Sequence, residues 1–342
     1  MAAKPGAQNF ADPHIAAVLR RGGLIGLTDN PELVPLTGGV SSAIWRVALN
    51  DQEICVKRAH DRLQVAAEWH APVERNKFEA RYYATLQRIA SGLAPRLIYV
   101  DRPYNTLVME FLPPERFSLW KAALMTGQVD RPAAAAVGAA LGAIHAATAL
   151  SAQIASDFDS HRIFSDIRLE PYLLAMIQTH PDLGRPLKQL AERTFSTRRV
   201  LVHGDVSPKN ILLDGTRPVF LDAECAVYGD PAFDLAFCLN HLLLKRAVLP
   251  DRGADLMAAF DRLVDAYLAR VTWEPRLAVE ARTASLLPAL TLARIDGKSP
   301  VEYIDDEALR LHIRETVRPM ISTPPPSLRS VAAAWHEAMD HV

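Results

Sequence analysis

The stretch VHGDVSPKNILLD, residues 202–214, determines how the rest of the chain is interpreted. It places a carboxylate, Asp205, and a carboxamide, Asn210, five residues apart on a loop stiffened by Pro208. A carboxylate in such a loop can accept the proton of a hydroxyl group. The amide side-chain oxygen suits Mg²⁺, a hard cation that prefers oxygen ligands. Taken singly, these residues are ordinary turn formers, but their order favours a catalytic loop between two short strands.

A second metal-ligand candidate follows twelve residues after Asn210. Asp222 ends the run VFLD, and Glu224 continues the alternation of a strand. Carboxylate and amide oxygens together provide the donors that Mg²⁺ accepts from proteins. We therefore expect Asn210 and Asp222 to hold one metal ion, with Glu224 in a supporting position.

The chain between residues 33 and 56 alternates β-favouring runs, LVPL, AIWRVAL and EICVK, with turn signals. The turn LTGGVSS, residues 36–42, joins the first two runs. Its glycines and small hydroxyl residues let backbone N–H groups approach phosphate oxygens closely. The residues concerned are Gly38, Gly39, Ser41 and Ser42. Alone, a Gly-Gly pair between strands is most often an ordinary hairpin turn.

A lysine, Lys57, ends the next strand and would reach back under the glycine turn toward the phosphates. A lysine at a strand end is usually solvated, so it needs an acidic partner to be held in the cleft. Glu79 follows 22 residues later, on a helix expected over residues 75–89. Glu74 is the competing partner, and surface charge is the alternative for both. The register of the helix favours Glu79.

These parts together match what phosphoryl transfer from ATP requires of a protein. The reaction needs a cover for the phosphates, a cation beside them, magnesium ligands and a carboxylate next to the acceptor hydroxyl. The sequence therefore predicts a Mg²⁺- and ATP-dependent phosphotransferase in which Asp205 is the catalytic base.

The composition is that of an ordinary globular protein. Of 342 residues, 49% are hydrophobic and 23% charged, and 38 basic residues nearly cancel 39 acidic ones. No general electrostatic field therefore favours nucleic acid or an anionic membrane. Three cysteines, Cys55, Cys225 and Cys238, lack metal-ligand spacing and are expected to be buried free thiols in a reducing cytoplasm. The Ala- and Gly-rich segment 133–152 is expected to be a buried helix and not a membrane span.

The order of patterns along the chain predicts an α+β fold with two lobes. A helical lead-in over about residues 1–30 precedes the strands, and two more strands are expected over 96–100 and 106–111. Beyond residue 114 the pattern is helical, except for a β island over 200–221. Helices are expected over 131–150, 187–194, 255–270 and 276–294. The nucleotide-binding lobe, a small antiparallel sheet with one main helix, would span 1–111, and a helical lobe with the acceptor site 112–342.

The chain resembles the aminoglycoside phosphotransferase and choline kinase-like superfamily, which has the two-lobed fold of protein kinases. The resemblance covers about residues 33–300 and rests on HGDVSPKN, on LDAE and on GDPAFDLA at 229–236. It implies the roles argued above for Lys57, Glu79, Asp205, Asn210 and Asp222. It also implies that Asp234 braces the catalytic loop and that Glu110, Phe111 and Leu112 form the hinge facing adenine. His203 and Lys209 are expected to support the site.

Within that superfamily, several stretches are most similar to methylthioribose kinase. They are the long connection from Lys57 to Glu79 with Trp69 and Arg75, the run DAECAVYG, and ARIDG at 293–297. Two departures predict a different or broader acceptor. A single arginine, Arg294, stands where that enzyme has a consecutive pair, and Asn210 stands where it usually has serine. Arg294 is a candidate acceptor-binding residue.

The acceptor is expected to be a small molecule with a hydroxyl group, such as a sugar, a nucleoside-like compound or an aminoglycoside. A polycationic aminoglycoside would need an acidic pocket, for which Asp157, Asp159, Asp166, Glu170 and residues 305–307 are candidates. An ATP-binding pseudoenzyme is the alternative, although the intact Asp205, Asn210 and Asp222 argue against it. A protein kinase is less expected, because only a short segment separates Asp222 from Gly229. The sequence leaves the oligomeric state open.

Overall fold

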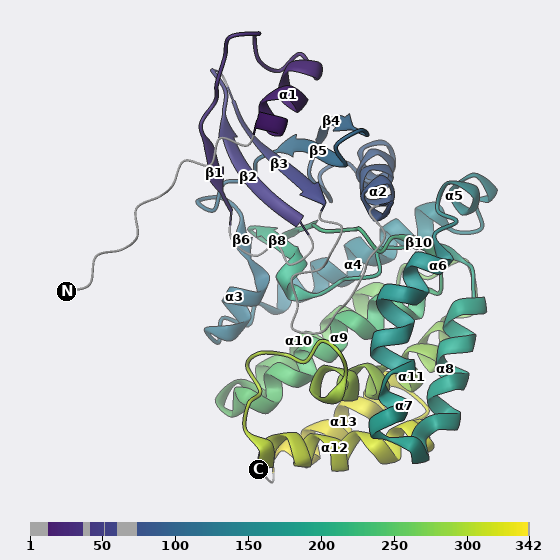
Figure 1. Cartoon of the computed structure of the whole chain (residues 1–342). Helices are drawn as coiled ribbons and strands as arrows, with labels where there is room; N and C mark the ends of the chain where they lie inside the picture. The colour runs from purple at the N-terminus through teal and green to yellow at the C-terminus, as the bar shows by residue number, and fades with distance from the viewer. Residues whose placement is uncertain (1–12, 37–41, 51, 60–73, 341–342) are drawn as a thin grey trace.

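The computed structural model describes residues 13–36, 42–50, 52–59 and 74–340. Figure 1 shows a sheet-containing lobe at the N-terminal end, packed on a larger lobe that is mostly helical. This arrangement confirms the expected α+β, two-lobed fold with an antiparallel sheet in the smaller lobe. Trp69 and most of the connection from Lys57 to Glu79 lie outside the described residues.

The smaller lobe contains a five-stranded antiparallel sheet with the order β1-β2-β3-β5-β4 among the described residues. The strands are β1 (Leu33–Pro35), β2 (Ser42–Ala48), β3 (Glu53–Ala59), β4 (Leu97–Asp101) and β5 (Thr106–Glu110). Two helices pack against this sheet, α1 (Pro13–Arg21) and α2 (Arg75–Ile89). Side chains alternate across a strand, and on β3 Ile54 and Val56 join the cluster formed with α1. Lys57 therefore points to the other face, toward α2.

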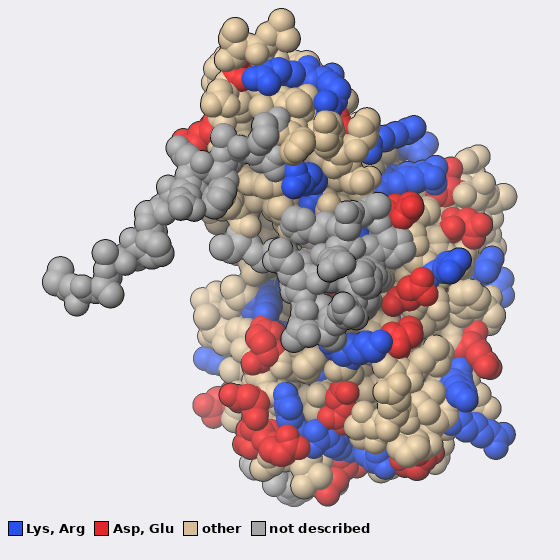
Figure 2. All heavy atoms as spheres, in the orientation of Figure 1, with Lys and Arg blue, Asp and Glu red and all other residues tan. Residues whose placement is uncertain are grey.

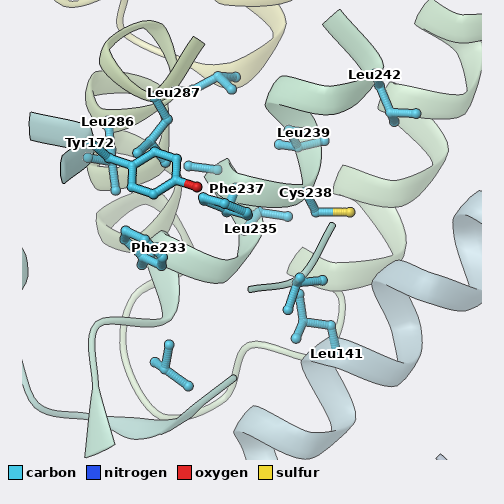
Figure 3. Close-up of a cluster of buried hydrophobic side chains, with 14 of the residues drawn as sticks. Leu141, Tyr172, Phe233, Leu235, Phe237, Cys238, Leu239, Leu242, Leu286 and Leu287 are labelled. Atoms are coloured by element: carbon cyan, nitrogen blue, oxygen red, sulfur yellow. The ribbon is translucent and has the colours of Figure 1, made fainter. Parts of the chain in front are cut away.

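The larger lobe is built around α9 (Pro231–Val248), which is buried along almost its whole length. Figure 3 shows Phe233, Phe237 and Leu239 of this helix within the hydrophobic core. The other α-helices are α3 (Trp120–Met125), α4 (Arg131–Thr148), α5 (Ala152–Asp157), α6 (His161–Phe164), α7 (Met176–Thr179), α8 (Gly184–Ser196), α10 (Gly253–Leu268), α11 (Arg276–Asp296), α12 (Glu307–Ser322) and α13 (Leu328–Met339). A helix of π type, η1 (Ser165–Leu174), joins α6 to α7.

The small residues of α4 permit a close approach to α10. A Cβ atom added at Gly138 would lie 2.2 Å from the backbone oxygen of Leu263, and one at Gly142 would lie 3.0 Å from that of Tyr267. The segment is thus a buried helix because its glycines fit against a neighbouring backbone. Within the described residues, no helix is long and apolar enough to cross a membrane.

Short strands in the larger lobe hold the catalytic loop. β7 (Val200–Val202) pairs with β10 (Val227–Gly229), and β8 (Ile211–Asp214) lies between β6 (Ser118–Leu119) and β9 (Arg217–Phe220). The loop between β7 and β8 contains the HGD sequence, with a single 3₁₀ turn, η3 (Pro208–Asn210), at its end.

Several sequence-based expectations differ from the structure. Among the described residues, the N-terminal helix covers only 13–21, and residues 1–12 lie outside that part of the chain. The strand expected to continue through Glu224 ends at Phe220. The reason is Asp222, whose φ of +65° belongs to the left-handed region and breaks an extended strand. Glu224 lies in the turn that follows. Cys225 and Cys238 are buried free thiols as expected, whereas Cys55 is only half-buried.

Candidate active site

The catalytic loop begins with a backbone turn that requires glycine. Gly204 has a φ of +82°, and a Cβ atom there would lie 2.7 Å from both the Cβ and the carbonyl oxygen of Cys225. An L-residue at this position would be strained by its backbone conformation and by the contact. The glycine of the HGD sequence therefore lets the loop lie directly against the segment that follows Asp222.

A buried carboxylate, Asp234, holds the start of this loop. It lies in the first turn of α9 and accepts hydrogen bonds from the backbone N–H groups of His203 and Gly204, at 2.7 and 2.8 Å. His145 Nε2 lies 3.3 Å from the same carboxylate, and His145 Nδ1 lies 2.8 Å from the Tyr267 hydroxyl. The loop is thereby tied to α9, α4 and α10. His145 and Tyr267 have no sequence motif and were not expected here.

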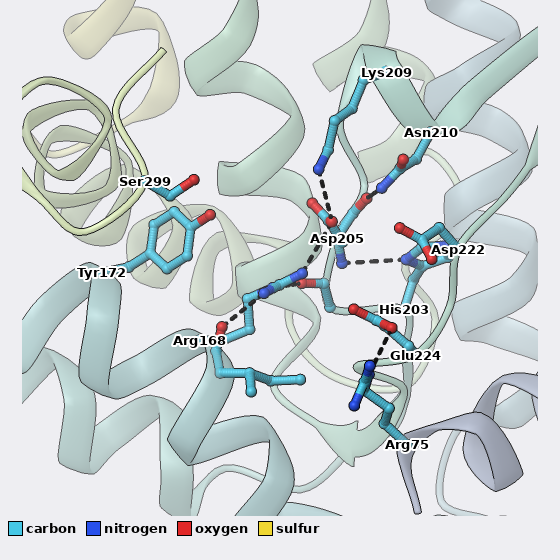
Figure 4. A network of polar contacts seen from close by, with 12 residues as sticks. Arg75, Arg168, Tyr172, His203, Asp205, Lys209, Asn210, Asp222, Glu224 and Ser299 are labelled. Atoms are coloured by element: carbon cyan, nitrogen blue, oxygen red, sulfur yellow. Dashed lines mark hydrogen bonds and ion pairs between the residues drawn. The ribbon is translucent and has the colours of Figure 1, made fainter. Parts of the chain in front are cut away.

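Two cations flank Asp205 at the centre of the loop. Its carboxylate lies 2.9 Å from the guanidinium of Arg168 and 3.5 Å from Nζ of Lys209, as Figure 4 shows. Burial by itself raises the pKa of Asp205, but the positive charges of Lys209 and Arg168 outweigh it and lower the pKa. Asp205 is therefore ionised at neutral pH and can accept a proton. Arg168, on η1, is the main site residue that the sequence did not indicate.

The imidazole of His203 joins the loop to the segment before Asp222. Its Nε2 lies 3.0 Å from the carbonyl oxygen of Leu221, and its Nδ1 accepts the backbone N–H of Asp205 at 3.2 Å. Burial lowers the pKa of His203, so the ring is neutral and its Nε2–H donates to Leu221. The ring also packs edge-on against Tyr82 of α2, at 5.2 Å between centroids.

Lys57 is held in the cleft by two carboxylates. Its ammonium lies 2.7 and 2.8 Å from the two oxygens of Glu79 and also pairs with Asp222. Burial alone would lower the pKa of Lys57, but Asp222 and Glu79 raise it overall. Tyr83 completes the arrangement, because its hydroxyl donates to Glu79 at 2.8 Å and accepts the backbone N–H of Asp222 at 2.9 Å. Glu74 lies exposed at the start of α2.

The two expected metal ligands lie on adjacent, directly bonded segments. The Asn210 side-chain N–H donates to the backbone oxygen of Asp205 at 3.1 Å, which leaves the amide oxygen as the acceptor that can bind a cation. The Asn210 backbone oxygen accepts the N–H of Leu221 at 2.8 Å. The pKa of Asp222 is strongly lowered, because Lys57 and Lys209 outweigh the effect of burial.

This donor set fits Mg²⁺. An ionised carboxylate and an amide oxygen are hard ligands, and Mg²⁺ is usually bound by one or two such groups together with substrate phosphates. No group of three or more His, Cys, Asp or Glu side chains suited to a metal occurs in the described part of the chain.

An ion pair between the lobes lies beside this site. Arg75, fully buried at the start of α2, donates to Glu224 at 2.9 Å, and the pair is drawn in Figure 4. Glu224 thus supports the segment after Asp222 from the turn in which it lies. The sequence indicates Arg75 only through the family resemblance and does not predict its ion pair with Glu224.

Part of the expected phosphate cover lies outside the described residues, namely Gly38, Gly39 and Ser41. Ser42, at the start of β2, is buried, and its hydroxyl has no hydrogen-bond partner among the described residues. Residues 110–112 connect the lobes and line a pocket of about 470 Å³ together with Arg96, Arg116 and Arg217. Lys57 and residues 203–210 do not line that pocket.

Arg294 does not contact Asp205 but lies behind Tyr172. Its guanidinium donates to the Tyr172 hydroxyl at 3.2 Å and to the Ser299 hydroxyl at 2.9 Å. The guanidinium carbons of Arg294 and Arg168 both lie 5.8 Å from the centre of the Tyr172 ring. The aromatic ring therefore connects Arg294 to the arginine that holds Asp205.

Comparisons with known proteins identify the family and the fold of the chain. The sequence profile of a family described as the phosphotransferase enzyme family matches residues 32–279. A choline/ethanolamine kinase family protein from Mesorhizobium loti is similar in structure, with a TM-score of 0.52 and 16% identity over 95% of this chain and 99% of that chain. Choline kinase from Cryptosporidium parvum Iowa II has a TM-score of 0.50 and 14% identity over 96% and 93%, respectively. At these identities the two structures show a shared fold. A sequence comparison with curated proteins gives no match.

Proposed function

The chain belongs to the phosphotransferase enzyme family, and on that basis we propose that it transfers the γ-phosphate of ATP to a hydroxyl group of a small molecule. The observation that carries this proposal is the joining of Asp205, Asn210 and Asp222 by direct hydrogen bonds between their segments. A protein that only bound nucleotide would not need a buried, ionised carboxylate between two cations.

In the proposed reaction, Asp205 accepts the proton of the acceptor hydroxyl. The hydroxyl oxygen forms a bond to the γ-phosphorus, and the bond from that phosphorus to the β,γ-bridging oxygen breaks, so that ADP leaves. Arg168 and Lys209 hold the carboxylate in place and keep it ionised. Such positioning supplies most of the catalysis in phosphoryl transfer.

Lys57 is proposed to bind the nonreacting phosphates. In the structure its ammonium contacts Asp222 as well as Glu79, so nucleotide binding would replace the contact with Asp222 by contacts with phosphate. Asp222 and the amide oxygen of Asn210 would then be available to Mg²⁺. The bound ion neutralises charge that develops on the phosphate oxygens.

The lobes would divide these tasks. We propose that residues 1–111, with the glycine turn and Lys57, hold the nucleotide and that residues 112–342 hold the acceptor. The hinge at 110–112, where the two ranges meet, would also contact the nucleotide. The resemblance to kinases implies that adenine lies against the hinge.

A turnover screen tests the proposal. Pure protein with Mg²⁺ and ATP is incubated with sugars, polyols, sugar acids, nucleosides, choline and aminoglycosides, and phosphorylated products are detected by mass spectrometry. The expected result is a product heavier by one phosphoryl group, formed by the parent and lost in Asp205→Asn. Tight Mg-ATP binding without any transfer would instead support an ATP-binding pseudoenzyme.

A further inference from the structure

Four basic side chains lie close together in the larger lobe, near the loop of residues 203–210. We call this group the basic cluster. Its members are Lys121 on α3, His241 and Lys245 on α9, and Arg294 on α11. Helices α9 and α11 pack together, and α3 packs on the turn that ends the catalytic loop, η3. In addition, α9 carries Asp234, which binds the start of the loop, and α11 packs on η1, which carries Arg168.

Lys245 is a buried cation without an acidic partner. Lys245 is only 1% exposed. Its ammonium donates a long hydrogen bond of 3.4 Å to the Tyr303 hydroxyl. No carboxylate lies within ion-pair distance of it in the described part of the chain. Burial, together with the nearby charge of Lys121, lowers the pKa of Lys245 to about 7. The ammonium also lies 4.8 Å from the centre of the Tyr303 ring. Neither contact supplies a negative charge, and burying a cation without one is costly, so packing alone does not explain a lysine here.

His241 and Arg294 also have unused hydrogen-bonding atoms. His241 is 6% exposed, and its buried Nε2 has no partner among the described residues. The buried Nε of Arg294 likewise has none there. Burial, followed by the charges of Lys245 and Arg294, lowers the pKa of His241. Nearly all buried polar groups in proteins find a partner, so unpaired ones on the packed helices α9 and α11 indicate a place for a ligand.

The negative charge near the basic cluster does not balance it. Glu302 is the carboxylate whose charge acts on Lys245, and it already forms an ion pair with Lys121 at the surface. Lys245 and Arg294 thus remain without a carboxylate in ion-pair contact among the described residues. The missing counter-charge is what an anionic ligand would bring.

The basic cluster lies near both of the cations that flank Asp205. Lys209, 3.5 Å from Asp205, is close enough to His241 for its charge to lower the histidine pKa. On the other side, Tyr172 connects Arg294 to Arg168. Figure 4 shows Tyr172 and Ser299 across from Asp205 and Lys209, with the tyrosine hydroxyl directed toward them.

The acidic residues expected for a polycationic acceptor do not gather at this place. Asp159 is 76% exposed and contacts His161, and Glu170 pairs with Lys298 at the surface. Asp306 caps the N-terminus of α12, and Glu307 pairs with Arg314. Asp157 accepts a hydrogen bond from a neighbour on its own helix, Gln153, and Asp166 is exposed. These carboxylates are thus spread over the surface or already paired with cations, and on the face of the larger lobe that Figure 2 shows, acidic and basic side chains are interspersed.

We propose that the acceptor carries an anionic group, a carboxylate or a phosphate, bound by Lys245, Arg294 and His241 while its hydroxyl faces Asp205. This inference rests on the proposed phosphotransferase function and names the class of its substrate. The transferred phosphoryl group and the anionic group would lie at separate ends of a small hydroxylated molecule. The product would gain one phosphate and keep the original anion.

A matched acceptor series tests the charge of the substrate. Glucose, gluconate, glucose 6-phosphate and glucosamine present similar hydroxyl groups with neutral, carboxylate, phosphate and ammonium character, and shorter polyols and their acids extend the series. The expected result is that kcat/KM is at least about tenfold higher for anionic members, as loss of a charged contact would give. The carboxylate and phosphate arms show which anion is preferred. Equal or better turnover of neutral or cationic members would overturn the proposal.

A binding experiment separates this proposal from the proposed function. Malonate and inorganic phosphate are titrated against the parent, Lys245→Met and Lys188→Met, and the melting temperature is recorded. Methionine is close to lysine in size and suits an apolar site, so Lys245→Met is expected to melt no lower than the parent. Stabilisation by at least one anion is expected in the parent and in the exposed-lysine control Lys188→Met, and it should be lost in Lys245→Met. No stabilisation of the parent, or the same stabilisation in all three, would overturn the anion site whatever the enzyme phosphorylates.

Discussion

In the proposed reaction, the neighbours of Asp205 fix its position and its charge but do not make it a strong base. Arg168 and Lys209 lower its pKa, which makes it a weak base but keeps it ionised and fixed. Because the transition state of phosphoryl transfer is loose, the position of the carboxylate matters more than its proton affinity. We therefore propose that the Asp205 carboxylate orients the acceptor hydroxyl and receives its proton late.

Replacing this carboxylate tests its role. Asp205→Asn removes the proton acceptor but keeps the size of the side chain, so kcat is expected to fall by about 10²–10⁴-fold. Mg-ATP binding, followed by fluorescence or calorimetry, should remain close to that of the parent. A kcat within about threefold of the parent would mean that another group accepts the proton.

The partner of Lys57 gives a second test at this scale. Glu79→Gln removes one of the two charges that hold the lysine, and kcat/KM for ATP is expected to fall by about tenfold or more, since a lysine side chain is flexible when unpaired. Glu74→Gln is the matched control, because Glu74 is exposed and has no side-chain capping hydrogen bond. Its kcat/KM should stay near the parent value. If kcat/KM for ATP fell in Glu74→Gln and not in Glu79→Gln, Glu79 would be excluded as the functional partner of Lys57.

Among the elements, those with a clear local pattern were predicted well. The helix expected over 75–89 coincides with α2, because apolar residues at helical spacing mark its buried face. The short strands β6 and β10 were missed, since each forms only through pairing with a strand distant in sequence. The strand predicted across LDAE was wrong, because the left-handed backbone at Asp222 ends it.

The same distinction separates the site residues that sequence reasoning found from those it missed. Asp205, Asn210 and Asp222 lie in two short motifs, whose order and spacing are visible in the chain. Arg168 and Tyr83 act through contacts with residues 37 and 139 positions away, and no local signal marks them. The π-type helix that carries Arg168 has a proline inside it, and such helices are often found at functional sites.

The close packing of α4 on α10 permits a test at the scale of elements. Gly138→Ala places a methyl group against the backbone of Leu263, so one helix must move, and overpacking of this kind costs about 1–3 kcal/mol. Gly184→Ala is the control, because its added Cβ would meet only a side-chain methyl group of Ile177 at 3.3 Å. Urea unfolding followed by circular dichroism measures both. Equal stability of the two variants would show that the helices do not approach as closely as the structure has them.

At the scale of the whole molecule, the contacts between the lobes converge on the segment around Asp222. Arg75 bonds to Glu224, and Lys57 pairs with Asp222. The backbone N–H of Phe220 donates to the carbonyl oxygen of Leu93, in the turn after α2, at 2.8 Å. The family resemblance inferred from the HGD loop is confirmed by the profile match.

Nucleotide and metal should therefore stabilise the molecule together. At 100 times its Kd, Mg-ATP is expected to raise the free energy of unfolding by about 2.7 kcal/mol, whereas ATP with EDTA should raise it much less. Asn210→Ala and Asp222→Ala each remove one oxygen ligand, and the magnesium-dependent part of the shift should shrink in both. Melting curves with and without Mg²⁺ measure this. Parent-like shifts in both variants would place the metal elsewhere.

The two hydrogen bonds from the loop to Asp234 determine how fast the amide protons that form them exchange with solvent. The amide protons of His203 and Gly204 are bound by a carboxylate on the buried helix α9 and not by a neighbouring strand. They can exchange with deuterated solvent only when α9 separates from the loop, so their exchange rate reports the opening of the larger lobe's core. The amide protons of these two residues, next to Asp205, should thus be among the slowest to exchange in the protein, although they lie in a loop.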